Sequence, residues 1–400
     1  SQEEFLRDVE AIDNLSVKAS YGVQGNDAIG SYYAWQALYN LGWSNATESG
    51  AMVSSVENKN VSWESNYNFN VGVEARIFDR FDISLEWYKR TSKGMLLNYP
   101  LALSTGFDGY NRNSGTMVNS GIEAAITANV VRTNNFQWNL TVMGSTVKNK
   151  VIKLTDDGKD ILSGNYLIRE GEELYSFYVP RSAGIDPTNG DQLYWAYNTY
   201  TSADVTAGNC TEEQVGQKIP DSDYITNSHT AALASRVVSG SRMPKVYGSI
   251  TNQFRLGSFD FSISTNYSVG GKVLDGVYLT LRSFGYTAQT KSVDVLRAWQ
   301  KPGDVTDVRR YQIGESTVTT DADLVNASYF SIKNITFGYT LPQSLVSKAG
   351  IKGLRASVTA DNVVLFTHLK GMNPQNNFTG GTSFSYIPTR TIAFNLDFSF

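Results

Sequence analysis

The stretch NYNFNVGVEARIF (66–78) places an apolar side chain at every second position. Its alternating apolar residues are Tyr67, Phe69, Val71, Val73, Ala75 and Ile77. Successive side chains of a β-strand point to opposite faces. The stretch therefore predicts a long strand with one apolar face and one polar face.

The same alternation recurs along the chain, for example in FDISLEWYKR (81–90) and in the last ten residues, TIAFNLDFSF. Many of the stretches exceed the usual length of a globular strand and approach the length that a tilted strand needs to cross a bilayer. By the strand-reading rules there are about twelve such strands. They lie at 13–24, 66–78, 81–97, 116–130, 135–148, 173–184, 191–199, 244–256, 258–271, 326–341, 352–365 and 388–400.

The connections between these strands alternate in length. Short ones are predicted at 79–80, 132–135, 186–191, 256–257 and 341–351, and long ones at 25–65, 98–115, 149–172, 200–243, 272–325 and 366–387. An up-and-down sheet with tight turns at one end and long loops at the other is typical of an outer-membrane β-barrel. We therefore expect an all-β, antiparallel transmembrane barrel with short periplasmic turns and long extracellular loops.

Composition supports this fold class. The 400 residues include 23 Tyr, 19 Phe and 34 Gly but only 9 Pro, which suits strands and turns. The expected polar face carries ions that a soluble core would not accept, among them Glu74, Arg76, Asp82, Glu86, Asp260, Arg355 and Asp361. A net charge of −4 argues against nucleic-acid binding. One cysteine, Cys210, excludes an intramolecular disulfide.

Five stretches in order carry a resemblance to a known family. They are NLSVKASYGVQGN (14–26), NSGTMVNSGIEAAI (113–126), MPKVYGSITNQFRLGSFDFSISTNYSVGGKVLD (243–275), NASYFSIKNITFGYTLP (326–342) and LRASVTADNVVLFTHLKGMNPQ (354–375). Together they resemble the C-terminal barrel portion of SusC/RagA-type TonB-dependent outer-membrane transporters. The resemblance spans nearly all 400 residues.

The resemblance implies energised nutrient uptake across the outer membrane, with no enzymatic activity and no cofactor. Its implied partners are a SusD-like surface lipoprotein, the TonB complex acting through an N-terminal part, the barrel-assembly machinery, outer-membrane lipid and a carbohydrate or peptide substrate. The family's signal peptide, TonB-contacting segment and plug domain find no counterpart in residues 1–400. Since family barrels have twenty-two strands, we expect residues 1–400 to be the C-terminal part of a longer barrel.

Other classes remain open at this stage. One is a self-contained twelve-strand pore or lipid-acting enzyme, for which His229 or His368 would need a nearby serine such as Ser228 or Ser235. Another is a soluble β protein of the cell surface. The acidic stretch TDDGKD (155–160) lacks the ligand spacing of a calcium loop and is expected to form a hydrated turn.

Two sets of residues stand out as functional candidates, and neither is catalytic or metal-binding. Loop aromatics could contact a substrate or partner: Tyr32, Tyr33, Trp35, Trp43 and Trp299. For any one of them, packing of loops against one another is the more common role. The alternating apolar residues of the last strand resemble a barrel-assembly signal: Phe394, Leu396, Phe398 and Phe400.

Overall fold

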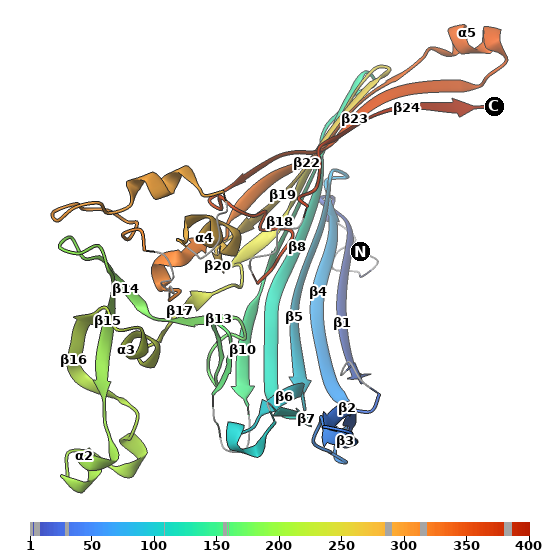
Figure 1. The fold of residues 1–400 in the computed structure, drawn as a ribbon. Coiled ribbons are helices and arrows are strands. Elements are labelled where there is room, and N and C mark those ends of the chain that lie inside the picture. The colour runs from blue at the N-terminus through green and yellow to red at the C-terminus, as the bar shows by residue number, and fades with distance from the viewer. Residues whose placement is uncertain are drawn as a thin grey trace.

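The computed structural model describes residues 3, 9–28, 32–107, 109–154, 158, 160–284, 290–312, 318–379 and 386–400. One large, curved antiparallel sheet dominates these residues (Figure 1). Ten of its strands follow chain order, and each pairs with its neighbours in that order. They are β1 (Ile12–Asn26), β4 (Glu64–Ile77), β5 (Phe81–Lys93), β8 (Thr116–Arg132), β9 (Phe136–Thr146), β18 (Val246–Leu256), β19 (Phe259–Val269), β22 (Tyr329–Thr340), β23 (Gly353–Thr367) and β24 (Thr391–Ser399). An eleventh strand, β10 (Lys148–Lys153), pairs with the start of β8.

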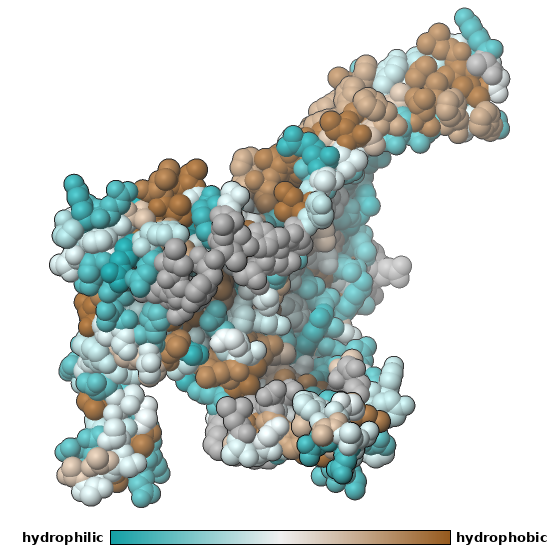
Figure 2. All heavy atoms as spheres, in the orientation of Figure 1, coloured by the Kyte–Doolittle hydropathy of each residue, from teal (hydrophilic) through white to brown (hydrophobic). Residues whose placement is uncertain are grey.

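The strand register aligns the apolar side chains into one continuous face. Ile83 of β5 lies opposite Ile126 of β8, which lies opposite Val142 of β9. At the other end of the sheet, Val358 stands between Phe337 and Phe394. These apolar side chains are not covered: Phe337 is 50% exposed and Phe394 80% exposed. Figure 2 shows hydrophobic surface on the arm formed by the last strands.

The opposite face carries the predicted ions, and many of them are paired. Lys18 contacts Glu74 at 2.6 Å, and Arg355 contacts Asp260 at 2.7 Å. The Asn334 amide donates to Asp361 at 2.7 Å. The predicted division into an apolar and a polar face is confirmed. No helix of the described residues is long and apolar enough to cross a membrane.

The predicted number of strands is wrong in one region. The stretches 173–184 and 191–199 do not join the large sheet but form β13 (Ser176–Val179), β14 (Arg181–Ile185) and β15 (Gln192–Thr199) of two smaller sheets. Side chains such as Phe177 and Tyr194 are fully buried there, because these strands pack within their own connection. The predicted turn at 186–191 does exist, as the hairpin between β14 and β15. The described wall therefore has ten up-and-down strands, where the sequence indicated about twelve.

Five long connections, here called links, alternate with four short turns. The links are 27–63, 94–115, 147–245, 270–328 and 368–390, numbered 1 to 5, and the turns are 78–80, 133–135, 257–258 and 341–352. Because neighbouring strands are antiparallel, all links lie at one end of the sheet and all turns at the other. The predicted sorting of connections by length is confirmed for the ten wall strands, and the two long loops predicted at 149–172 and 200–243 belong to link 3. The short turn predicted at 186–191 does not follow this sorting, because it lies within link 3 and joins two strands outside the large sheet.

The links carry the remaining secondary structure. Links 1 and 2 contain β2 (Tyr39–Asn45), β3 (Glu48–Val53), β6 (Leu96–Pro100), η1 (Leu103–Thr105) and β7 (Gly109–Asn113). Link 3 adds β11 (Ile161–Ser163), β12 (Tyr166–Ile168), α2 (Ser202–Thr206), η2 (Glu212–Gln214), β16 (Lys218–Thr226), α3 (His229–Ala234) and β17 (Val237–Ser241). Link 4 holds β20 (Lys272–Leu274), α4 (Gly276–Arg282), η3 (Val293–Arg297), η4 (Asp321–Asp323) and β21 (Leu324–Asn326). The turn before β23 carries α5 (Gln343–Val346) and η5 (Ser347–Ala349).

Candidate functional site: a region built by links 3, 4 and 5

Links 3 and 4 are joined at the hairpin between β14 and β15. The Trp299 indole and the Gly303 main-chain N–H both donate to the main-chain oxygen of Pro187, at 3.0 and 2.8 Å. The guanidinium of Arg310 contacts Asp191 at 2.8 Å. The ring of Trp299 also lies against Gly190, where an added Cβ would stand 2.7 Å from it. Two regions far apart in sequence thus form one packed unit.

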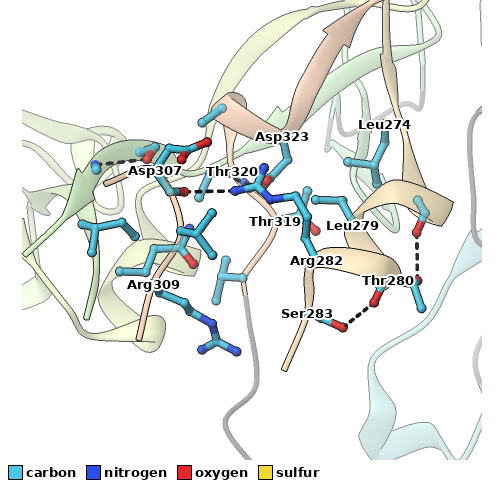
Figure 3. Close-up of a pocket in the computed structure, with 18 residues that line it drawn as sticks. Leu274, Leu279, Thr280, Arg282, Ser283, Asp307, Arg309, Thr319, Thr320 and Asp323 are labelled. Carbon is cyan, nitrogen blue, oxygen red and sulfur yellow. Dashed lines mark hydrogen bonds between the residues drawn. The ribbon is translucent and has the colours of Figure 1, made fainter. Parts of the chain in front are cut away.

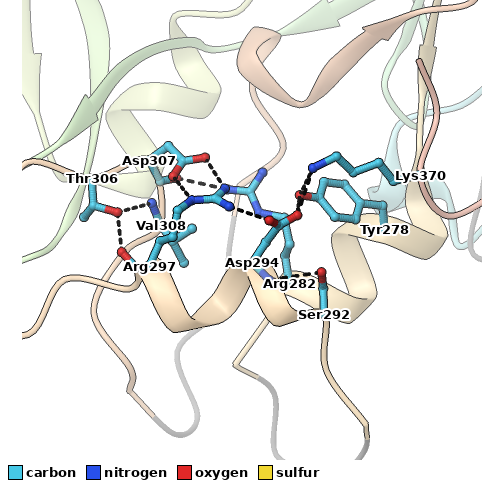
Figure 4. Close-up of polar contacts among 9 residues, drawn as sticks. All are labelled: Tyr278, Arg282, Ser292, Asp294, Arg297, Thr306, Asp307, Val308 and Lys370. Carbon is cyan, nitrogen blue, oxygen red and sulfur yellow. Dashed lines mark hydrogen bonds and ion pairs between the residues drawn. The ribbon is translucent and has the colours of Figure 1, made fainter.

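Links 4 and 5 are held together by two carboxylates. Asp275, only 1% exposed, accepts the main-chain N–H groups of Tyr278, Lys370 and Gly371 at 2.8–3.0 Å. Asp294 binds the Lys370 ammonium at 2.9 Å and also contacts the Tyr278 hydroxyl and Arg297 (Figure 4). Gly371 permits this approach, since a Cβ there would stand 2.6 Å from the Asp275 carboxylate. We call this arrangement the Asp275/Asp294 clasp.

The charges of the clasp stabilise one another. Hydrogen bonds from Tyr278, Lys370 and Arg297 hold the pKa of Asp294 well below its usual range. Hydrogen bonds to Asp294 and Tyr278 raise the pKa of Lys370. A small buried hydrophobic cluster of Val273, Ala327 and Leu369 joins the same two links. Polar and apolar contacts therefore fix link 5 on link 4.

Links 3 and 5 meet at a buried arginine. Arg242 is 4% exposed, and its Nε donates to the main-chain oxygen of Phe378, while its guanidinium lies 4.5 Å from the Phe378 ring centre. The Tyr166 hydroxyl donates to the oxygen of Thr379 at 2.7 Å. Burial lowers the pKa of Arg242 and raises the pKa of Tyr166 to about 12. No sequence pattern had singled out either residue, because their roles depend on contacts across more than 130 positions.

A pocket of about 510 Å³ opens between links 3 and 4 (Figure 3). One wall comes from β14 and β15 and includes Ile185; another comes from α4 and includes Leu279 and Arg282. The third is the segment around η4, with Thr320 and Asp323. Its volume lies in the range of small-molecule sites. The clasp contacts α4, which forms one wall of the pocket. Link 5 therefore helps to hold that wall in place.

The predicted loop aromatics do not form one cluster. Tyr32, Tyr33, Trp35 and Trp43 are exposed in link 1, with Tyr32 94% exposed, whereas Trp299 packs between links 3 and 4. Direct contact of any of them with a substrate or partner stays a prediction. Phe394, Leu396, Phe398 and Phe400 are exposed at β24, and their role in assembly also stays a prediction.

The residues considered for hydrolysis have structural contacts. His229 meets the Tyr194 ring edge-on at 5.7 Å, and Ser235 accepts the N–H of Tyr197 at 3.0 Å. Ser228 caps α3 by accepting the N–H of Ala231 at 3.3 Å. Of the stretch 155–160, residues 155–157 and 159 lie outside the described residues, and Asp160 pairs with Arg169 at 2.6 Å. In the described residues no group of three potential metal ligands occurs.

Comparison with known proteins adds the family context. No known family profile matches the chain. Over 392 residues it is 28% identical to the TonB-dependent receptor P3 of Formosa agariphila, covering 94% of this chain and 37% of that protein. It is 22% identical over 385 residues to the TonB-dependent receptor SusC of Bacteroides thetaiotaomicron, covering 94% and 36%. The chain is similar to SusC/RagA-type TonB-dependent receptors.

The fold of these receptors is shared as well. The solved structure of the RagAB peptide transporter superposes with a TM-score of 0.83 at 24% identity, over 99% of this chain and 42% of that one. The predicted SusC/RagA-type resemblance and the all-β barrel-wall architecture are confirmed. The chain spans well under half the length of the relatives it matches.

Proposed function

We propose that the chain forms part of the wall and the outer loops of an outer-membrane β-barrel that imports nutrients. The observation that carries this proposal is the apolar face that crosses the ten wall strands opposite an ion-bearing face, with many of its side chains exposed. Such a band is stable in lipid, while the polar face suits a water-filled lumen. The links then face outside and the short turns face the periplasm.

The transport role rests on similarity to the SusC/RagA-type receptors. We propose that residues 1–400 form the C-terminal barrel part of a longer protein. For that protein we propose energised uptake through TonB, insertion by the barrel-assembly machinery and capping by a SusD-like lipoprotein. The substrate class is a large nutrient, a glycan or a peptide. Similarity to proteins named as receptors and a transporter supports this role over a lipid-acting enzyme.

Lysine substitution on the two faces of one strand tests the membrane assignment. Leu85 is 49% exposed on the apolar face of β5, and its neighbour Ser84 lies on the polar face opposite Glu74. In a bilayer, Leu85→Lys should cost about 2–4 kcal/mol of unfolding free energy near the midplane. Ser84→Lys, the matched control, should cost much less because lysine there meets water and a carboxylate.

The measurement is urea unfolding of the full-length protein refolded into lipid vesicles, followed by tryptophan fluorescence. A soluble protein would tolerate both exposed substitutions within about 0.5 kcal/mol. Equal stability of the two variants in vesicles would overturn the proposal, and so would failure of the wild type to enter vesicles.

A further inference from the structure

The pocket between links 3 and 4 has an aliphatic lining. Ile185, Leu274, Leu279, Val308 and Val318 contribute its apolar surface. None of the described lining residues is aromatic, although aromatic faces are the usual platform for flat, apolar ligand surfaces. The lining therefore favours a ligand with branched aliphatic groups over a ring that stacks.

Two arginines line the pocket, Arg282 and Arg309, and Arg282 retains unused hydrogen-bonding capacity. Arg282 extends from the end of α4 and, within the described residues, donates one hydrogen bond, to the main-chain oxygen of Asp307 at 3.0 Å. Its guanidinium also lies 5.5 Å from the Tyr278 ring centre. A guanidinium has five N–H donors in a planar fork that matches a carboxylate. The Asp307 carboxylate pairs with the guanidinium of Arg297 at 3.0 Å. It therefore does not pair with the guanidinium of Arg282.

Two carboxylates line the pocket, Asp307 and Asp323, and Asp307 is paired with Arg297. Asp323 of η4 accepts the N–H and the hydroxyl of Thr320 through one oxygen, Oδ2, at 2.8 and 3.1 Å. Its Oδ1 accepts no hydrogen bond from the described residues. Burial raises the pKa of Asp323, while Thr320 and the charge of Arg282 oppose that shift. A ligand ammonium at Oδ1 would stabilise the charged form of the Asp323 carboxylate against the cost of burial.

We propose that this pocket binds a small aliphatic zwitterion, an amino acid or a short peptide. The Arg282 guanidinium receives the ligand carboxylate, Asp323 receives the ammonium, and the wall around Leu279 receives the aliphatic side chain. Such a ligand supplies an anion for Arg282, a cation for Asp323 and an apolar group for the aliphatic lining. The inference rests on the proposed function for its role in uptake, but binding is measurable without transport.

Calorimetric titration of the detergent-solubilised full-length protein tests the pocket. The probes are leucine, Leu-Leu, N-acetyl-Leu-Leu, Leu-Leu amide and maltotriose. Leu-Leu or leucine should bind, and either blocked dipeptide should bind at least about tenfold more weakly than Leu-Leu, since each loses one charge-assisted contact. Comparison of leucine with Leu-Leu separates the amino acid from the peptide as the ligand.

Two variants that remove a charge locate the contacts. Asp323→Asn keeps an oxygen for the Thr320 hydrogen bonds but removes the charge, so it should weaken Leu-Leu and leave N-acetyl-Leu-Leu unchanged. Arg282→Gln should weaken Leu-Leu and leave Leu-Leu amide unchanged. Leu279→Trp should fill the pocket and abolish binding. Leu233→Trp, at an exposed position of α3 outside the pocket, should not.

Several results would overturn the inference. They are absence of Leu-Leu and leucine binding at millimolar concentration, equal binding of free and blocked dipeptides, or displacement of Leu-Leu by maltotriose. Equal losses for both ligands in Asp323→Asn would also contradict it. Failure of vesicle insertion with intact Leu-Leu binding would instead refute the proposed membrane function and leave the pocket assignment standing.

Discussion

Single residues explain how ions are accommodated on the polar face. Arg355 of β23 reaches across β22 to Asp260 of β19 because Gly338, which lies between them, has no side chain. Arg355 also contacts Asp397 of β24 at 3.3 Å. The sequence predicted that Asp260 and Arg355 lie on the polar face. It could not predict their pairing, because that depends on the register of strands about 95 positions apart.

Gly338→Ala tests this arrangement. An added Cβ would stand 2.5 Å from both the Arg355 guanidinium and the Asp260 carboxylate, so the ion pair must move. Overpacking of this kind costs about 1–3 kcal/mol. Gly22→Ala is the control, since a Cβ at Gly22 of β1 has no atom within 4 Å. Urea unfolding in vesicles should show the loss for Gly338→Ala alone, and equal stability of the two variants would contradict the assigned role of Gly338.

At the scale of elements, strands were more predictable than links. The alternation of apolar and polar residues in β4 or β24 can be seen within a single stretch of sequence. It therefore predicts a strand wherever the two faces of that strand lie in different environments. In link 3 the same alternation misled, because β13 and β15 bury residues against their own connection. The pocket and the clasp had no local signature, since Asp275, Asp294 and Lys370 come together only through the packing of links 4 and 5.

Lys370→Met should loosen link 5 from link 4. The substitution keeps an apolar stem but removes the ammonium that Asp294 binds. We expect several-fold faster amide hydrogen exchange in segments 276–282 and 368–372, with unchanged exchange in β4 and β5. Lys301→Met, at an exposed position in link 4, is the control. Unaltered exchange in both segments would mean that the Asp275 contacts alone hold the links.

The clasp should also respond to pH in a defined direction. Because the pKa of Asp294 is lowered in the folded protein, its contribution is complete above the ordinary Asp pKa and is lost as pH falls through the lowered value. The raised pKa of Lys370 makes its contribution complete below the ordinary Lys pKa and lost as pH rises through the raised value. Intrinsic-rate-corrected protection of 368–372 should therefore stay level between about pH 5 and pH 9 and fall only outside that window.

At the scale of the molecule, the ten-strand wall has two end strands, β1 and β24, each paired on one side within the described residues. The apolar face runs without a break to β24, where Ala356, Val358 and Ala360 face Leu396, Phe394 and Ile392. The relatives that the chain matches are more than twice as long, and the chain covers 37% and 36% of two of them. The length of the strands, the alternation of their side chains and the sorting of the connections could all be predicted from the sequence. Each follows from strands that have an apolar environment on one face and a polar environment on the other.

Deletion of Phe400 tests the proposed assembly role of the last strand. The rings of Phe398 and Phe400 stack with centres 6.4 Å apart, and both are exposed, so they offer an apolar end for the barrel-assembly machinery to bind. Without Phe400, the full-length protein should accumulate unassembled and protease-sensitive in cells. Ser399→Ala, a change beside it on the polar face, should assemble like the wild type. Cell fractionation and heat-dependent gel mobility measure the folded fraction, and normal membrane insertion of the deletion variant would exclude Phe400 as part of the signal.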